Sequence, residues 1–226
     1  RLLEACAQNT TARLLDEVMP FIIEVVELTA VCEGPVPWRD PVWQYRSRGM
    51  HYSVDDHILG AAETALQTLA KLSTELFVSY IQRIKDTPYE TLDFLLMRAY
   101  SANPNVYADE SVDYLCDRPQ RMEVGWLNSN RGVAAELIKL TTPLCSRERF
   151  AKLEETLLTY FPDWEKRPGN GDYWGWSQYG LLQSCDQERF SDKAKRKLEE
   201  WRRKYGEWPE RETITGGMAQ LVGSPI

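Results

Sequence analysis

The sequence predicts an all-α fold, an α/α superhelix of HEAT- or TPR-like helical repeats that need not be regular. Two stretches repeat each other at an offset of 45 residues, with the matches Ser146/Ser191, Lys152/Lys197, Leu153-Glu154-Glu155/Leu198-Glu199-Glu200 and Tyr160/Tyr205. This offset lies within the roughly 40–47 residues of two- or three-helix repeat units. No convincing run of alternating β-branched residues predicts a strand, and helix-capping signals recur along the chain. Two ordinary helices that share a Leu-Glu-Glu run remain the alternative to a repeat.

The first helical zone is expected over residues 2–32, and Pro20 is expected to break or kink it because proline lacks a backbone donor and crowds the preceding turn. An irregular stretch follows over residues 33–52. Ser53 predicts an N-cap, with Asp55 and Asp56 favourably placed in the first turn. A narrow apolar seam then predicts one long helix that reaches residue 84; its members are Ile58, Ala62, Ala65, Leu69, Leu72 and Leu76.

The clearest local signal is Thr87-Pro88-Tyr89-Glu90, which predicts a capping box with proline at the first helical position. The helix that follows is expected to end at Asn103-Pro104. Asp109 or Ser111 is expected to start a short helix that stops before Pro119. Further helices are predicted over residues 133–140, 146–161, 173–184 and 191–205, and residues 208–226 are expected to be coil.

Composition excludes several classes of protein. The 226 residues are 43% hydrophobic and 27% charged, which is typical of a folded globular chain. The net charge of −7 disfavours general binding to nucleic acid or anionic membranes, whose binders carry a basic excess. The most apolar stretch, residues 21–32, is interrupted by Glu24 and Glu27, so no membrane span is expected.

The five cysteines are scattered and form no CxxC pair, which argues against a disulfide framework and a zinc ribbon. Buried, reduced thiols are expected, and with them a cytoplasmic location. The chain begins at Arg1 without a methionine or a signal-peptide pattern. We therefore expect residues 1–226 to be one helical-repeat segment of a longer protein, with a sub-boundary near the turn-rich residues 166–172.

Residue chemistry predicts no catalytic or metal site. The two histidines, His51 and His57, have no partners at metal-ligand spacing, and the paired acids are typical of solvated helix faces. The chain has neither GxGxxG nor GxxxxGK[ST], so no phosphate-binding loop and no cofactor are expected in it. The basic cluster of residues 193–204 contains acids and is best read as a solvated helix face, with a nucleic-acid contact as the alternative.

Aromatic and arginine side chains are the candidates for binding. The irregular stretch carries Trp38, Arg39, Trp43, Arg46 and Arg48, and a second group comprises Tyr173, Trp174 and Trp176. Tryptophan and arginine are enriched at interface hot spots, and three prolines limit the freedom of the first group. We expect the first group to be a contact surface. The competing interpretation is that these rings pack between helices in the core.

A resemblance adds a family. The run Leu95-Leu96-Met97-Arg98-Ala99-Tyr100, then Tyr107-Ala108-Asp109-Glu110 and Tyr114-Leu115, resembles an "LLxRAY…ADE…YL" pattern in the helical C-terminal region of bacterial STAND-type ATPases with a NACHT-like core. Similar matches are Cys145-Ser146, Leu153-Glu154-Glu155, the run from Tyr160 to Glu165, and the end from Gly216-Gly217-Met218 to Val222-Gly-Ser-Pro-Ile226. The match covers residues 90–226, and residues 1–85 add nothing to it.

The resemblance implies a non-enzymatic recognition and regulatory scaffold inside a large cytoplasmic ATPase of antiviral defence. ATP and Mg²⁺ would bind only to the NTPase domain of the parent protein. The implied partners are the other domains of that protein and a protein trigger. Two alternatives stay open: an α-helical enzyme domain, such as a carbohydrate-active one with an aromatic cleft, and a structural spacer.

Overall fold

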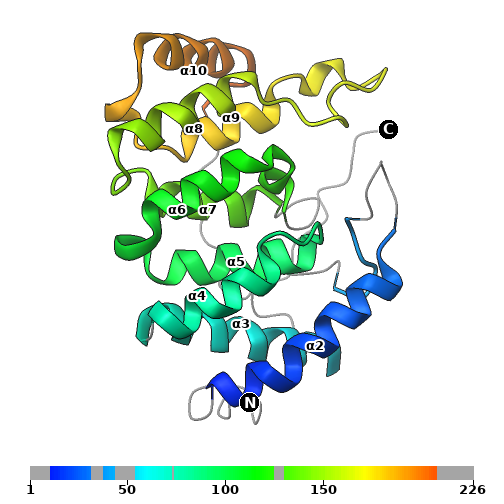
Figure 1. The fold of residues 1–226 in the computed structure, drawn as a ribbon. Helices are drawn as coiled ribbons and strands as arrows, with labels where there is room; N and C mark the ends of the chain where they lie inside the picture. The colour runs from blue at the N-terminus through cyan, green and yellow to red at the C-terminus, as the bar shows by residue number, and fades with distance from the viewer. Residues whose placement is uncertain (1–10, 32–37, 44–53, 73, 125–129, 208–226) are drawn as a thin grey trace.

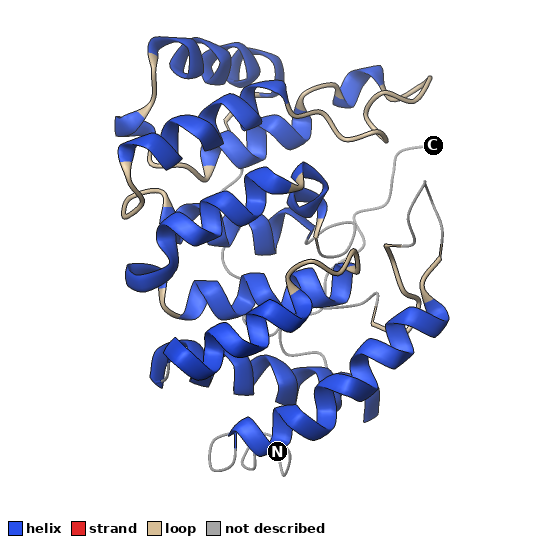
Figure 2. Ribbon diagram, viewed as in Figure 1, coloured by secondary structure: helices blue, strands red, loops and turns tan. Residues whose placement is uncertain are grey.

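The structure is a computed structural model that describes residues 11–31, 38–43, 54–72, 74–124 and 130–207. Within these residues the chain is all-helical and has no strand, only one isolated bridge between Val31 and Arg39 (Figure 2). The α-helices are α2 (Thr11–Thr29), α3 (Val54–Leu72), α4 (Thr74–Ile84), α5 (Glu90–Ala102), α6 (Pro104–Asp117), α7 (Asn130–Thr141), α8 (Arg147–Thr159), α9 (Trp176–Gln183) and α10 (Asp192–Tyr205). Short 3₁₀ turns are η1 (Pro119–Glu123), η2 (Gly171–Tyr173) and η3 (Gln187–Arg189). The predicted all-α class is confirmed for the described residues.

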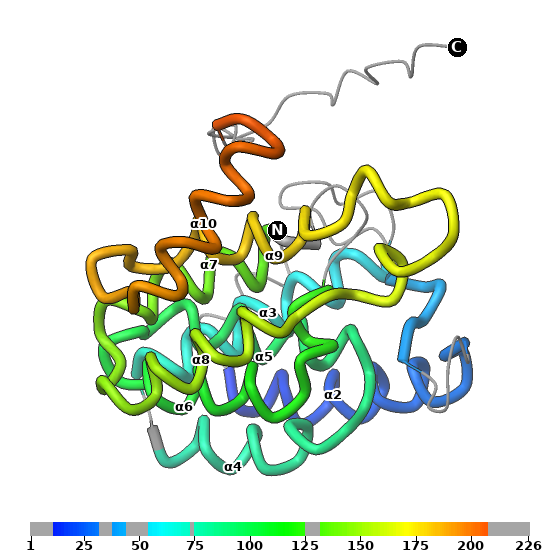
Figure 3. Tube along the Cα trace, turned by 90° about the horizontal axis from the view of Figure 1, so that it is seen from above, coloured from blue at the N-terminus to red at the C-terminus, as the bar shows by residue number. Residues whose placement is uncertain are grey.

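The helices stack in two layers. In one layer α3, α5, α7 and α9 contact each other in this order, and in the other α6 contacts α8 and α8 contacts α10 (Figure 1). Successive helices of the chain also touch across the layers, as α5 does with α6 and α9 with α10. Helix α2 packs on α3, and α4 packs on α3 and α5. Seen from above, α10 is drawn near α7 and α9, whereas α6 lies on the other side of the stack, towards α4 (Figure 3).

Helix α5 lies at the centre of the stack. All residues from Glu90 to Tyr100 are buried, which fits a helix that is apolar on every side and touches α3, α6 and α7. Its charged members therefore need partners within the protein. Arg98 meets Glu63 of α3 at 2.7 Å and Glu136 of α7 at 2.9 Å, so one guanidinium links three helices of the same layer.

The expected break at Pro20 is wrong. Helix α2 is continuous from Thr11 to Thr29 with Pro20 inside it. Its buried side chains lie on both sides of the proline and face α3; they are Leu15, Met19, Ile22 and Val26. Tertiary packing of this apolar face therefore outweighs the local cost of the proline.

The predicted long helix over residues 54–84 is also wrong, because α3 ends at Leu72 and a separate helix, α4, begins at Thr74. Leu69 is buried, as the seam predicts, but Leu72 is 78% and Leu76 45% exposed. Leu72 and Leu76 continue the apolar spacing but lie beyond the part of α3 that packs on α2. The spacing alone therefore predicts burial for two leucines that are exposed. Ser53 lies outside the described residues, and α3 starts directly after it with Asp55 and Asp56 in its first turn.

Two predicted helix starts are corrected. Helix α5 begins at Glu90, not after Thr87; the Thr87 hydroxyl instead donates to the carbonyl of Ile84 at the end of α4. The N–H of Glu90 donates to the carbonyl of Trp38 at 2.9 Å, and its carboxylate lies 3.5 Å from Arg39. Pro104 is the first residue of α6. This helix therefore starts before the predicted Asp109 or Ser111.

Helices α8 and α10 start as predicted. Ser146 and Ser191 are N-caps whose hydroxyls accept from the N–H of Arg149 and Ala194, both at 3.3 Å. Leu153 and Leu198, the matched leucines of the repeat, are both buried. Helices α7 and α9 also lie where helices are predicted. None of the described helices is long and apolar enough to cross a lipid bilayer.

Each of these N-caps also joins its helix to the previous helix of the same layer. The N–H of Ser146 donates to Asp109 of α6 at 2.6 Å, and the N–H of Ser191 donates to Glu154 of α8 at 2.8 Å. Both contacts span 37 residues. The two donors are 45 residues apart and so are the two acceptors, which is the offset of the sequence repeat.

Candidate functional site

The segment of residues 38–43 packs against α3 and α5. The indole N–H of Trp43 donates to the carbonyl of Asp55 at 2.9 Å, and the carbonyl of Trp38 accepts from the N–H of Glu90 at 2.9 Å. Trp43 is 1% exposed and Trp38 8% exposed. The segment thus supplies part of the core beside the N-termini of two helices.

The sequence prediction of a contact surface is wrong for these two rings, because the structure buries both. Arg39 is half-buried and forms ion pairs with Glu90 at 3.5 Å and Glu123 at 3.9 Å. Arg46 and Arg48 lie outside the described residues. An irregular segment rich in tryptophan therefore serves here as a plug over the ends of helices, the competing interpretation of the pattern.

A buried carboxylate holds this segment in place. Asp40 is 2% exposed and accepts from the N–H of Trp43 at 2.9 Å and from the hydroxyl of Thr91 on α5. A buried charge is tolerated only when hydrogen bonds replace its water. Asp40 is therefore a positioning residue for residues 38–43.

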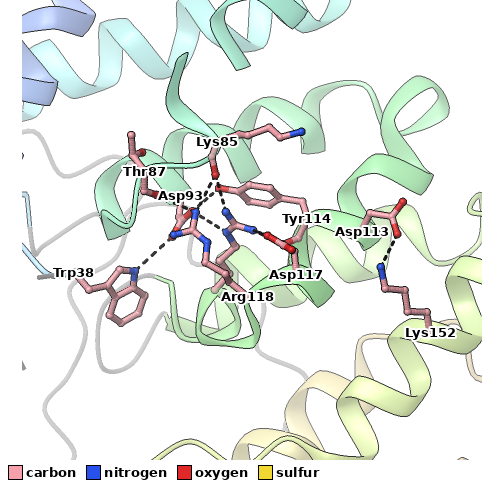
Figure 4. Close-up of polar contacts among 10 residues, drawn as sticks. Trp38, Lys85, Thr87, Asp93, Asp113, Tyr114, Asp117, Arg118 and Lys152 are labelled. Carbon is pink, nitrogen blue, oxygen red and sulfur yellow. Dashed lines mark hydrogen bonds and ion pairs between the residues drawn. The ribbon is translucent and has the colours of Figure 1, made fainter. Parts of the chain in front are cut away.

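A second buried acid, Asp93, is the centre of a larger polar network (Figure 4). One of its oxygens accepts from Arg121 Nε at 2.9 Å and from the hydroxyl of Tyr114. The other accepts from the indole N–H of Trp38 at 3.4 Å. Asp93 and Arg121 are 1% and 2% exposed in their side chains. This network fixes residue 38, α5, α6 and η1 relative to each other.

Arg121 uses its whole guanidinium group. It donates to the carbonyl of Tyr114 at 2.6 Å and to that of Lys85 at 2.8 Å, and it lies 3.5 Å from the centroid of the Tyr114 ring. Burial, followed by the negative charge of Asp93, raises the pKa of Tyr114 well above its usual value. The hydroxyl of Tyr114 therefore stays protonated and acts as a donor to Asp93.

A polar pocket of about 310 Å³ opens above this network. The turn after α4, helices α5, α6 and α8, and η1 supply its walls; the lining residues are Lys85, Asp86, Tyr100, Glu110, Asp113, Tyr114, Asp117, Arg121 and Lys152. Four of them lie at helical spacing on one side of α6: Glu110, Asp113, Tyr114 and Asp117. The pocket is thus an acidic side of α6 enclosed by residues from its neighbours.

The charges of the pocket are unequally paired. Asp113 meets Lys152 at 2.9 Å and Arg149 at 3.1 Å. Burial alone would raise the pKa of Asp113, but these hydrogen bonds outweigh it and hold the pKa below the usual range. Arg121 is neutralised by Asp93 below the pocket. The ammonium group of Lys85 then remains against the carboxylates of Asp86, Glu110 and Asp117.

When Arg149 and Arg118, which lies 3.6 Å from Asp93, are counted, the cations around the pocket equal the acids in number, so a cationic group would be bound by individual carboxylates and not by a net charge. Glu110 accepts from the Tyr100 hydroxyl at 3.1 Å, and Asp117 is 73% exposed with only a long contact of 3.5 Å to Arg121. Carboxylates with unused lone pairs bind guanidinium and ammonium groups through charge-assisted hydrogen bonds. The arrangement can hold a lysine or arginine side chain of a partner.

The second predicted binding group comprises Tyr173, Trp174 and Trp176, which lie between α8 and α10 along the chain. Tyr173 is 54% and Trp174 41% exposed, and the indole of Trp174 stacks on Phe161 with ring centroids 4.4 Å apart. Trp176 is half-buried and packs edge-on against Tyr205 at 5.0 Å. Of the predicted aromatic residues, Tyr173 and Trp174 are therefore the ones available at the surface.

The backbone beneath these rings is firmly held. Gly175 has φ of 87°, and a side chain there would overlap the ring of Trp201. The buried carboxylate of Glu165 accepts from the N–H of Gly175 at 2.8 Å and of Ser177 at 2.7 Å, at the start of α9. The exposed rings thus stand on a rigid support, which lowers the entropy that binding would cost.

The sequence predicts buried, reduced thiols. Cys145 and Cys185 are buried, as predicted, and burial raises the pKa of both thiols. Cys6, Cys32 and His51 lie outside the described residues. In the described part of the chain, no group of three or more His, Cys, Asp and Glu is placed to hold a metal ion.

Comparison with protein-family models, with curated proteins and with solved structures finds no match to this chain. A function for the chain is therefore inferred from its geometry and from the sequence resemblance.

Sequence reasoning missed the Asp93 network and the pocket above it. A signal was present: Asp93 stands inside the apolar run of Leu92, Phe94, Leu95 and Leu96. An acid at such a position is buried with the rest of the helix and needs a cation or several donors. The partner, Arg121, lies 28 residues away, and no local spacing identifies it.

Proposed function

We propose that this chain is a non-enzymatic recognition and regulatory scaffold, an α/α superhelix within a large STAND-type ATPase. The observation that supports a superhelix best is the repeated joint in which Ser146 contacts Asp109 and Ser191 contacts Glu154. Equivalent contacts at equal sequence distances are typical of stacked helical repeats, which present long surfaces to partners.

Two surfaces support recognition of a protein partner. The exposed rings of Tyr173 and Trp174 offer large apolar area on a rigid backbone, as interface hot spots do. The acidic pocket beside α6 offers carboxylates to a basic side chain. The partner that fits both is a protein segment with an apolar side chain and a lysine or arginine.

The place of the scaffold within a cytoplasmic antiviral ATPase comes from the sequence resemblance over residues 90–226. In this proposal the parent protein binds ATP and Mg²⁺ in its NTPase domain, and the scaffold holds that domain inactive until a trigger binds. A P-loop encoded beside this segment would support the proposal, and its absence would contradict it.

The direct experiment measures ATP hydrolysis by the full-length parent protein with and without candidate phage proteins as triggers. We expect Tyr173→Ala combined with Trp174→Ala to abolish activation. Asp86→Asn combined with Asp117→Asn should weaken activation by removing two carboxylates from the pocket. The matched control is Leu144→Ala, which also removes an exposed apolar side chain, 48% exposed, in the turn after α7.

The alternatives give different results. A structural spacer would give unchanged activation with both double variants. A carbohydrate-active domain would bind members of a glycan array through Trp174, with no effect of the pocket variant. If Leu144→Ala also abolished activation, ATP hydrolysis would not separate the binding surfaces from other surface positions. Binding of the trigger, measured by co-purification, would then be compared among the same variants.

A further inference from the structure

The outer side of α2 carries an unusual stripe of residues. Helix α2 lies at one end of the stack (Figure 1), and Leu15, Met19, Ile22 and Val26 face α3. Directly opposite, at helical spacing, lie the exposed Glu17, Phe21, Glu24 and Leu28. Phe21 is 44% and Leu28 78% exposed. The acidic stripe of α2, as we name these four residues, alternates a carboxylate with an apolar side chain.

The carboxylates of this stripe are unpaired in the described part of the chain. Neither Glu17 nor Glu24 forms an ion pair with another described residue, and neither does the adjacent Glu27. Asp16, by contrast, faces α4 and contacts Arg83 and Tyr80. The end of the stack formed by α2 therefore exposes apolar area between carboxylates that have no ion pair among the described residues, with Arg13 one turn before Glu17.

The opposite end of the stack is formed by α10, whose outer side is basic. Ala194, Leu198 and Trp201 face the protein. Across the helix lie the exposed Arg196 and Arg203, with Lys193 and Lys195 beside them. None of these four cations forms an ion pair with a described residue. Of the acids on this side, Glu199 pairs with Arg202 and Glu200 with Lys197, and only Asp192 is without an ion pair in the described part, so cations remain in excess.

The two ends match in spacing as well as in charge. Glu17 and Glu24 are seven residues apart on α2, and Arg196 and Arg203 are seven residues apart on α10. Seven residues of α-helix advance about 10.5 Å, so both pairs repeat after the same two turns. Two glutamates can therefore meet two arginines at once, whether the helices run parallel or antiparallel.

The apolar part of the stripe fits the same partner. When arginine binds a carboxylate, its three methylene groups lie along the neighbouring surface. Phe21 and Leu28 stand between and beside the two glutamates, where the stems of Arg196 and Arg203 would cover them. On a helix face with carboxylates alone, the methylene groups of the arginines would have no apolar surface to cover. On a face with apolar side chains alone, the guanidinium groups would have no carboxylate to bind.

We propose that this chain associates with copies of itself head to tail, with the acidic stripe of α2 in one copy docked on Arg196 and Arg203 of the next. The two surfaces differ, so the contact is heterologous, and each added copy presents the same two surfaces again. A stable complex buries about 1,200 Å² or more, and a contact between two single helices buries less than this area. Association is therefore reversible and depends on concentration and salt.

The test uses sedimentation equilibrium of the purified chain over a range of protein and salt concentrations. The weight-average mass should rise with protein concentration at low salt and return to the monomer value at high salt. Glu17→Arg with Glu24→Arg, and separately Arg196→Glu with Arg203→Glu, should each lower the association constant about a hundredfold or more, because like charges then face each other.

The decisive sample is the equimolar mixture of the two double variants. Each variant alone presents like charges at both ends, but the reversed α2 of one matches the reversed α10 of the other, so mixing should restore the rise in mass. Circular dichroism must give wild-type thermal midpoints, which is expected for exposed residues. A monomeric wild type at low salt, association that survives either double variant, or a mixture that stays monomeric would each overturn the proposal.

Discussion

Replacement of Arg121 by methionine tests the role assigned to the buried network. The substitution keeps most of the aliphatic stem and removes the guanidinium group. Asp93 then loses its closest cation, at 2.9 Å, and the carbonyl of Tyr114 loses a donor at 2.6 Å. The carbonyl of Lys85 keeps a partner, because Arg118 also donates to it at 2.9 Å.

The size of the effect follows from what is left behind. Removing one member of a buried ion pair costs about 3–5 kcal/mol because the other charge stays buried. Asp93 retains the donors Trp38 and Tyr114, and Arg118 lies 3.6 Å away, so the lower part of this range applies. We expect a loss of about 3 kcal/mol in the free energy of unfolding. For a chain of this length that lowers the thermal midpoint by roughly 10 °C.

Urea denaturation followed by circular dichroism measures this loss, with an unchanged m-value as evidence that the compactness of the unfolded state is unaltered. The matched control is Arg149→Met. Arg149 also binds an acid, Asp113, at 3.1 Å, but both side chains are more than a third exposed, so its loss should lower stability far less than the loss of Arg121. Equal effects of the two substitutions would refute the reasoning that burial makes the Asp93–Arg121 pair important.

Four further predictions concern stability. Trp43→Ala should cost about 3–5 kcal/mol in urea melts because it empties a fully buried site, and an unchanged midpoint would return this ring to the surface. Leu69→Ala should cost about 2–5 kcal/mol, whereas Leu72→Ala, at a 78% exposed position, should change stability by less than about 0.5 kcal/mol. Gly175→Ala should lower the thermal midpoint strongly, because it combines positive φ with overlap of a buried ring, and a wild-type midpoint would contradict that geometry. Burial and the hydrogen bond to an acid raise the pKa of Tyr80 to about 12, so its stabilising effect is complete below the unfolded pKa of about 10 and disappears as pH rises towards 12; Tyr80→Phe should remove this part of the alkaline loss of stability.

Local signals predicted the parts of the fold that local chemistry decides. Ser146 and Ser191 start helices as their capping chemistry requires, and the absence of alternating patterns correctly indicated a helical protein. The signal at Thr87 failed because other residues compete for the same groups. The distant Trp38 and Arg39 take the N–H and the carboxylate of Glu90, and the nearby carbonyl of Ile84 takes the hydroxyl of Thr87.

The candidate site was harder to predict because it depends on burial. Trp43 and Trp174 are the same residue type in similarly aromatic surroundings, yet one is 1% and the other 41% exposed. The difference arises because the N-termini of α3 and α5 cover the segment that contains Trp43. This is a tertiary contact that no local sequence pattern indicates. The pocket beside α6 likewise needs Lys85 and Lys152, 67 residues apart in the sequence, to meet one helix side.

The joint between N-cap and acid has a consequence for how such a chain can lengthen. Helix α8 carries both halves of the joint. Its N-cap Ser146 binds α6, and Glu154, eight residues later, binds the N-cap of α10. A gene segment that encodes α8 and the helix paired with it would, on duplication, bring along a complete connector for each neighbour. New units could then be inserted within the stack without compensating substitutions elsewhere, so the number of stacked helices could change separately from the exposed surfaces.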